Sequence, residues 1–154
     1  MEQRFNWKTK LFSKKFEIYQ HDSLKGEIFK ENWSRKVTGE LNARRVRFET
    51  KGFFKNETSI IDLQGEIGAG KVIFAGIISK ATIIYQNREY KWQFDNFLRS
   101  KWSVNDENGA IVRYHSNAFT GIITSYTRDE ILILTGFFIR NFLKQRSAAI
   151  AAAS

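Results

Sequence analysis

The stretch that decides the fold stands near the C-terminal end of the chain, where residues 129–146 read DEILILTGFFIRNFLKQR. Acidic side chains at its start and basic ones at its end suit the dipole of an α-helix. Its first half is apolar on every side, which is typical of a helix buried in protein or in a membrane. Residues 131–139 would rise only about 14 Å, less than half of a ~30 Å bilayer core. Extending the span to Leu143 would place Arg140 in lipid, which is costly.

We therefore predict a helix over about residues 129–146 that is surrounded by protein and does not span a membrane. The side chains expected to fill the core from this helix are Ile131, Leu132, Leu134, Phe137, Phe138 and Phe142. Residues 147–154, SAAIAAAS, form a low-complexity tail. Because alanine favours helix, the tail either prolongs the helix or frays.

The chain before this helix reads as strands. In residues 89–95, EYKWQFD, aromatic side chains share one face and polar ones the other, and residues 45–49 and 101–104 alternate in the same way. Such alternation is typical of strands with one buried face. Turn signals recur along the chain, at His21–Ser23, Lys51–Gly52, Gly68–Gly70, Gln86–Arg88 and Asn105–Gly109. About ten to twelve short strands predict a sandwich or a barrel, and one closed sheet around the apolar helix would satisfy both patterns.

Composition limits the classes of protein that remain. The 154 residues suit a single domain, predicted over residues 1–146. With no cysteine and only His21 and His115, disulfides, thiolate zinc sites and multi-histidine metal sites are excluded. We expect no metal and no cofactor. The N-terminal segment lacks the apolar core of a secretory signal, so the expected location is the cytoplasm.

Two stretches carry a resemblance to a known family. One is YKWQF at 90–94 with KWSVNDENGAIV at 101–112, and the other is the apolar segment 131–143. The chain resembles the tubby C-terminal-like superfamily, which includes LURP-one-related proteins and phospholipid scramblases. The resemblance implies a mainly β fold, a closed barrel of roughly twelve strands that encloses a hydrophobic C-terminal helix. It also implies a link to membranes, since tubby proteins bind phosphoinositides. Scramblase activity is not carried over, because the chain has no cysteine to palmitoylate and its Asp106–Gly109 segment reads as a turn.

The net charge of +9 is concentrated at the beginning of the chain. Residues 1–55 carry +7 and residues 56–154 only +2. Arg44, Arg45 and Arg47 form the densest basic cluster, and two arginines on one strand face could grip neighbouring phosphates. The residues that would enlarge the patch, if the fold gathers them, are Lys8, Lys10, Lys14, Lys15, Arg35 and Lys36. The alternative is a solvated strand face, diluted by Glu49.

Other motifs give no catalytic constellation. Residues 65–71, GEIGAGK, resemble a P-loop, but Val72 replaces the hydroxyl residue and a strand-like run follows, so a glycine-rich turn is expected. Asp129 and Glu130 are interpreted as helix-start residues rather than an acid–base pair. The aromatic residues that could stack on nucleic-acid bases, but are mostly expected in the core, are Trp7, Trp33, Trp92, Trp102, Phe53 and Phe54.

The sequence therefore predicts a non-enzymatic binding module. Its expected ligand is an anionic, phosphoinositide-like membrane lipid or another phosphate-bearing molecule, held by a basic outer face at the inner membrane surface. A protein-interaction or structural domain is the first alternative. Nucleic-acid binding ranks below it, and an enzyme or small-molecule carrier ranks last.

Overall fold

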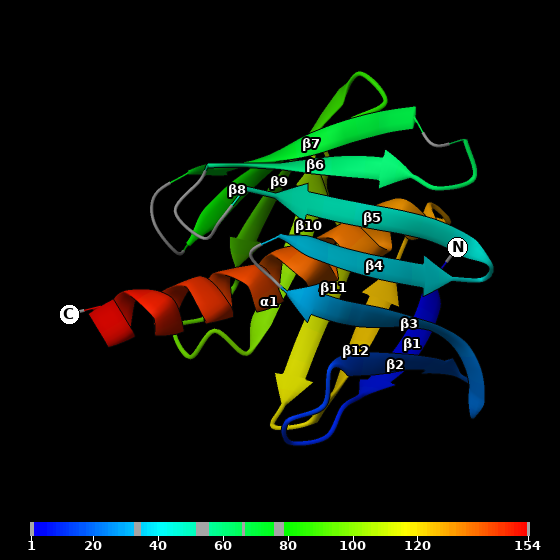
Figure 1. The fold of residues 1–154 in the computed structure, drawn as a ribbon. Coiled ribbons are helices and arrows are strands. Elements are labelled where there is room, and N and C mark those ends of the chain that lie inside the picture. Colours follow the sequence, from blue (N-terminus) through cyan, green and yellow to red (C-terminus); the bar gives the residue numbers. More distant parts are fainter. Residues whose placement is uncertain (1, 33–34, 52–55, 66, 76–78, 154) are drawn as a thin grey trace.

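The computed structural model describes residues 2–32, 35–51, 56–65, 67–75 and 79–153 (Figure 1). It contains twelve strands and one helix. The elements are β1 (Gln3–Lys8), β2 (Lys15–Gln20), β3 (Ser23–Asn32), β4 (Lys36–Leu41), β5 (Arg44–Thr50), β6 (Glu57–Asp62), β7 (Ile67–Ala75), β8 (Lys80–Tyr85), β9 (Arg88–Phe94), β10 (Lys101–Asp106), β11 (Gly109–Asn117), β12 (Thr120–Ser125) and α1 (Glu130–Ala153).

The strands form one closed antiparallel barrel, as the sequence predicts. Each strand pairs with its neighbours along the chain, and β1 pairs with β12 to close the ring. Hairpin turns at 21–22, 42–43 and 86–87 have positive φ at both central residues, which matches the right-handed twist of the paired strands. The predicted turn at Gly68–Gly70 is wrong, because these residues lie inside β7 beside a register shift between Ile60 and Ile61, and the turn falls at 63–65.

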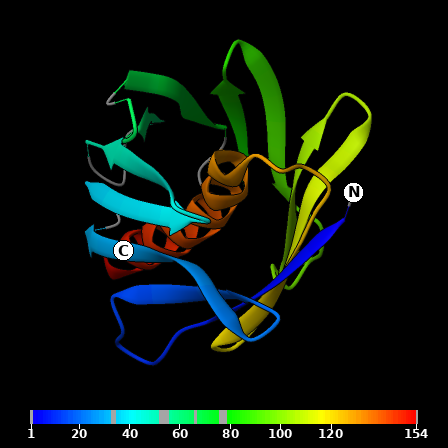
Figure 2. The ribbon, with the colours of Figure 1, turned by 90° about the vertical axis from the view of Figure 1, so that its right-hand side faces the viewer.

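Helix α1 passes through the barrel (Figure 2). Every residue from Ile131 to Ile139 is buried, and the core side chains named above are at most 3% exposed. Phe138 stacks on Phe48 of β5 with ring centroids 4.4 Å apart, and Phe137 meets Trp7 of β1 edge to face at 5.2 Å. The helix is apolar on all sides, and strand side chains bury it on all sides.

The ends of α1 define the two ends of the barrel. Asp129 Oδ1 caps the helix by accepting the N–H groups of Ile131 (3.1 Å) and Leu132 (3.4 Å). The helix continues past the predicted end at Arg146 to Ala153, since the alanine-rich tail prolongs it. The end at which α1 leaves the barrel is called the exit end below. Within the described residues, no helix is long and apolar enough to cross a membrane.

Three polar side chains fasten the helix to the β9–β11 wall. The indole N–H groups of Trp92 and Trp102 both donate to the carbonyl of Gly136, at 3.0 and 3.2 Å. The Tyr114 hydroxyl donates to the carbonyl of Ile133 at 2.7 Å. These buried bonds set the depth and rotation of α1, because an unpaired donor in the core is costly.

Arg146 is the buried cation of the helix. It is 5% exposed, its guanidinium lies 5.8 Å from the Phe74 ring centroid, and its Nε and Nη1 atoms have no hydrogen-bond partner among the residues that the structure describes. Burial lowers its pKa. We expect Arg146→Met to raise the free energy of unfolding by about 1 kcal/mol, because the apolar side chain removes unsatisfied buried donors. Urea unfolding measures this, and a decrease of similar size would show that the arginine has an anionic partner in solution.

Candidate functional site

The basic residues singled out from the sequence do not gather on one face. Arg44 and Arg45 begin β5 at the end of the barrel opposite to the exit end. Arg47 lies in the middle of β5. Lys14, Lys15, Arg35 and Lys36 lie at the exit end, where β2 and β4 begin. The N-terminal charge excess is therefore divided between the two ends.

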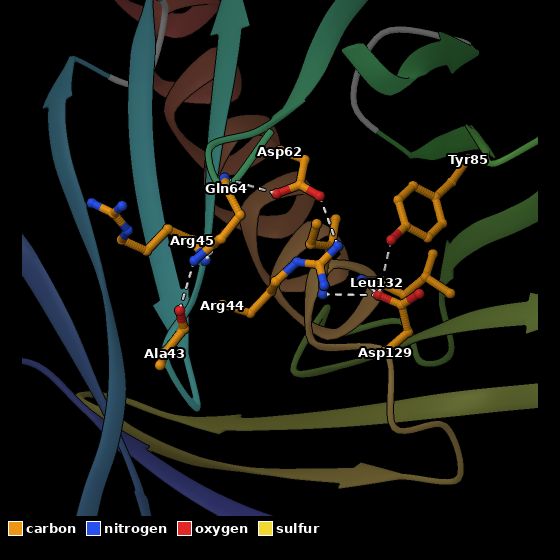
Figure 3. Close-up of polar contacts among 9 residues, drawn as sticks. Ala43, Arg44, Arg45, Asp62, Gln64, Tyr85, Asp129 and Leu132 are labelled. Carbon is orange, nitrogen blue, oxygen red and sulfur yellow. Dashed lines mark hydrogen bonds and ion pairs between the residues drawn. The ribbon is translucent and has the colours of Figure 1, made fainter. Parts of the chain in front are cut away.

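Arg44 belongs to a half-buried polar network that closes the opposite end (Figure 3). Its guanidinium pairs with Asp62 at 2.7 Å and points toward Asp129, the helix cap. The Tyr85 hydroxyl donates to Asp129 Oδ1 at 3.2 Å, and burial, reinforced by Asp129, raises the pKa of Tyr85. These contacts join β5, β6 and β8 to the start of α1, so Arg44 is placed to hold the barrel together.

Carboxylates lie beside most of the other predicted ligand residues. Arg47 pairs with Glu49 at 3.2 Å and Lys15 with Glu27 at 3.7 Å. Lys36 stands opposite Glu49 in the ladder, and Arg45 opposite Glu40. A groove of about 880 Å³ holds Arg35 and Lys36, but Glu49 and Glu57 line it too. The outer wall of β4–β6 is therefore a mixed-charge surface.

The exit end instead carries an arc of exposed apolar side chains, called the exit arc here. The arc consists of Leu11 and Phe12 in the β1–β2 loop, Phe97 and Leu98 in the β9–β10 loop, and Phe119 between β11 and β12. Phe12 and Phe97 are 95% and 97% exposed. The Thr9 N–H donates to the Phe119 carbonyl and joins the β1–β2 loop to the β11–β12 turn, and the Ser116 N–H donates to the Ser100 carbonyl and joins the end of β11 to the β9–β10 loop, both at 2.8 Å.

The two larger loops of the arc are held in shape by their own hydrogen bonds. Asn96 Oδ1 accepts the N–H groups of Ser100 (3.0 Å) and Lys101 (3.1 Å), and Thr9 Oγ1 donates to the Lys15 carbonyl at 2.8 Å. Phe12 has a φ of 63°, a left-handed conformation that is unfavourable for a bulky side chain. The exposure of Phe12 and its backbone conformation both lower the stability of the fold. Residues with such backbone conformations cluster at functional sites.

Cationic side chains surround the arc. The β1–β2 loop is flanked by Lys8, Lys10, Lys14 and Lys15, of which Lys15 pairs with Glu27, and the β9–β10 loop by Arg99 and Lys101, all exposed. The β9–β10 loop begins with the exposed Asp95, whereas residues 9–14, 96–100 and 118–119, which are all described, include no aspartate or glutamate. The apolar side chains of the arc and the cations around them complement a surface that has an apolar interior and an anionic boundary.

The structure shows where several other residues that were interpreted from the sequence are placed. The P-loop-like residues 65–71 lead into a strand and not a helix, since β7 begins within them at Ile67. Trp7, Trp92 and Trp102 are core side chains at most 1% exposed, while Trp33, Phe53 and Phe54 lie outside the described residues. His21 occupies an exposed turn and His115 a position within β11. Among the described residues no histidine and carboxylate group could hold a metal ion.

The residues of the exit arc were missed from the sequence, although a signal for them exists. Leu11–Phe12 and Phe97–Leu98 are adjacent apolar pairs between polar residues. Adjacent residues of a strand face opposite sides, so such a pair cannot lie wholly in the core of a one-sided sheet.

Comparison with known proteins gives no assignment: no family model, no curated protein and no solved structure matches the chain. The resemblance to the tubby C-terminal-like superfamily stays a prediction.

Proposed function

We propose that the protein is a non-enzymatic module that binds the surface of an anionic membrane through its exit end. The observation that supports this most directly is the exit arc: exposed phenylalanine and leucine side chains on three connected loops, bordered by lysine and arginine. Apolar tips would enter the interface between headgroups and acyl chains, while the cations face the headgroups. The cytoplasmic leaflet, which carries anionic lipid, is the matching surface.

The expected binding energies indicate that the apolar tips and the lysines act together. A phenylalanine that leaves water completely contributes about 1.5–3 kcal/mol, and a lysine near an anionic surface about 1 kcal/mol. Two or three shallowly inserted tips with several lysines would give reversible binding. The attraction of the lysines falls within a Debye length of about 10 Å at 0.1 M salt, so binding should weaken as salt rises but not vanish.

Co-sedimentation of the full chain with vesicles tests the proposal. Phe12→Asn/Phe97→Asn should lower partition into vesicles of phosphatidylcholine plus phosphatidylserine about tenfold or more. Asparagine tolerates positive φ, so stability should be unchanged or higher, which urea unfolding measures. Leu24→Asn is the matched control, because Leu24 is 54% exposed at the opposite end.

Three results would contradict the proposal. One is equal partition of the wild type and the double variant. Another is equal, salt-insensitive binding to pure phosphatidylcholine, since that would leave the basic border without a role. The third is binding to neither vesicle type, which would overturn the membrane proposal and favour a protein partner for the arc.

A further inference from the structure

A small pocket opens where α1 leaves the barrel, between the helix and the β9–β10 loop. It has a volume of about 240 Å³. Arg99, Arg140 and Lys144 supply its charges, Ser147 a hydroxyl, and Phe94 and Leu98 an apolar side. No carboxylate is among the described residues that line it. The pocket adjoins the exit arc through Leu98, but its chemistry is different because three cationic side chains line it.

Among the described residues, Arg140 is fixed in place by neutral groups. Its Nη2 donates to Ser116 Oγ at 3.3 Å and its Nη1 to Asn141 Oδ1 at 3.2 Å. The guanidinium also lies 5.0 Å from the centroid of the Trp102 ring. These contacts orient the planar donor group without compensating its charge. Burial lowers the pKa of Arg140, which is the expected response of an uncompensated cation.

Lys144 lies one helical turn beyond Arg140 on the same face of α1. Its pKa is lowered by burial first, and then by the positive charges of Arg140 and Lys30. Like charges at this spacing destabilise a helix. Among the described residues Lys144 has no ion pair, so no carboxylate of these residues compensates the like charges that line the pocket.

We propose that this pocket binds a phosphomonoester group. A phosphomonoester carries close to two negative charges at neutral pH and three acceptor oxygens, and it can accept two parallel N–H bonds from a guanidinium. A carboxylate or a phosphodiester brings only one charge to the same cations. The small volume suits a phosphate without a large substituent, and Phe94 and Leu98 would contact its carbon chain. The group could belong to a soluble glycerol phosphate or to phosphatidic acid; the lipid source rests on the proposed function.

The soluble arm of the test titrates the full chain with sn-glycerol 3-phosphate by calorimetry. Lys144→Gln should weaken binding about tenfold. Lys80→Gln, which removes the same charge from an exposed lysine of β8 outside both the pocket and the basic border of the exit arc, should leave the affinity nearly unchanged. Equal losses in the two variants would mean a diffuse electrostatic effect and would overturn the pocket.

The lipid arm compares vesicles of phosphatidic acid with vesicles of phosphatidylserine at matched surface charge. Wild-type protein should prefer phosphatidic acid, and Lys144→Gln should abolish that preference while it keeps most binding to phosphatidylserine. Equal binding to both vesicles without binding of glycerol phosphate would overturn the pocket and leave the proposed function standing. Glycerol phosphate binding that depends on Lys144, without binding to either vesicle, would support the pocket and overturn the membrane proposal.

Discussion

Replacement of Leu134 by aspartate is expected to prevent the chain from forming a soluble, folded monomer. Leu134 is fully buried and lies beside Gly39, where Ile28 and Val46 also meet. An unpaired carboxylate at this point costs several kcal/mol even after relaxation, and the leucine contributes a further 2–5 kcal/mol, roughly, that is lost with its volume. Typical domains have only about 5–15 kcal/mol of stability in total.

Expression in the soluble fraction and near-ultraviolet circular dichroism measure this effect. Phe138→Asp should behave alike, because the Phe138 ring stacks on Phe48 inside the barrel. Leu134→Met is the matched control, since a swap that conserves volume costs less than about 1.5 kcal/mol. A soluble Leu134→Asp monomer with the wild-type aromatic spectrum would mean that the barrel does not enclose α1 in solution.

The fold was predictable because both of its patterns are local. Alternation in segments such as 89–95 assigns strand faces without knowledge of their partners, and the all-apolar stretch 131–139 requires protein on every side. A closed sheet around one helix satisfies both. The turn before β7 was misplaced because glycine also occurs at bulges, where the register of paired strands shifts, as between Ile60 and Ile61.

The functional surface was less predictable because it depends on which loops meet. In a barrel of sequential antiparallel strands, successive connections alternate between the two ends, so β1–β2, β9–β10 and β11–β12 share the exit end. That assignment requires every strand to be counted correctly. Conversely, residues that are close in the sequence can lie far apart in the barrel. Arg44 and Arg45 are near Lys36 along the chain, yet they stand at opposite ends of paired strands.

The exit end and the opposite end also differ in what their polar groups do. At the opposite end Arg44, Asp62 and Asp129 lie close together, which holds strands to the helix start. At the exit end, Arg140 and Lys144 share a pocket with like charges and Phe12 is exposed at positive φ. Features that lower stability persist where another role offsets them, so variants at the exit end should separate stability from binding.

Gly136→Val is expected to lower the free energy of unfolding by about 4 kcal/mol or more. A Cβ atom at Gly136 would collide with the Tyr114 hydroxyl and would lie 2.7 Å from both Tyr114 Cζ and Val104 Cγ2. The larger side chain must push α1 away from the β9–β11 wall. The indole N–H groups of Trp92 and Trp102 would then lose their shared acceptor. Two unsatisfied buried donors cost about 1–3 kcal/mol each, and overpacking adds roughly 1–3 kcal/mol.

Gly136→Ala tests the same contact with the smallest added side chain, and for this substitution helix propensity and steric contact change the free energy of unfolding in opposite directions. In an exposed helix, Gly→Ala stabilises by about 1 kcal/mol, whereas here the added methyl group should destabilise. Gly68→Ala is the control, since a Cβ there meets nothing within 4 Å. Tyr114→Phe removes the atom that the new methyl group meets first, so Gly136→Ala/Tyr114→Phe should lose less stability than the two single variants added together. Strict additivity of the unfolding free energies would mean that close approach of α1 to Tyr114 is not what requires glycine at position 136.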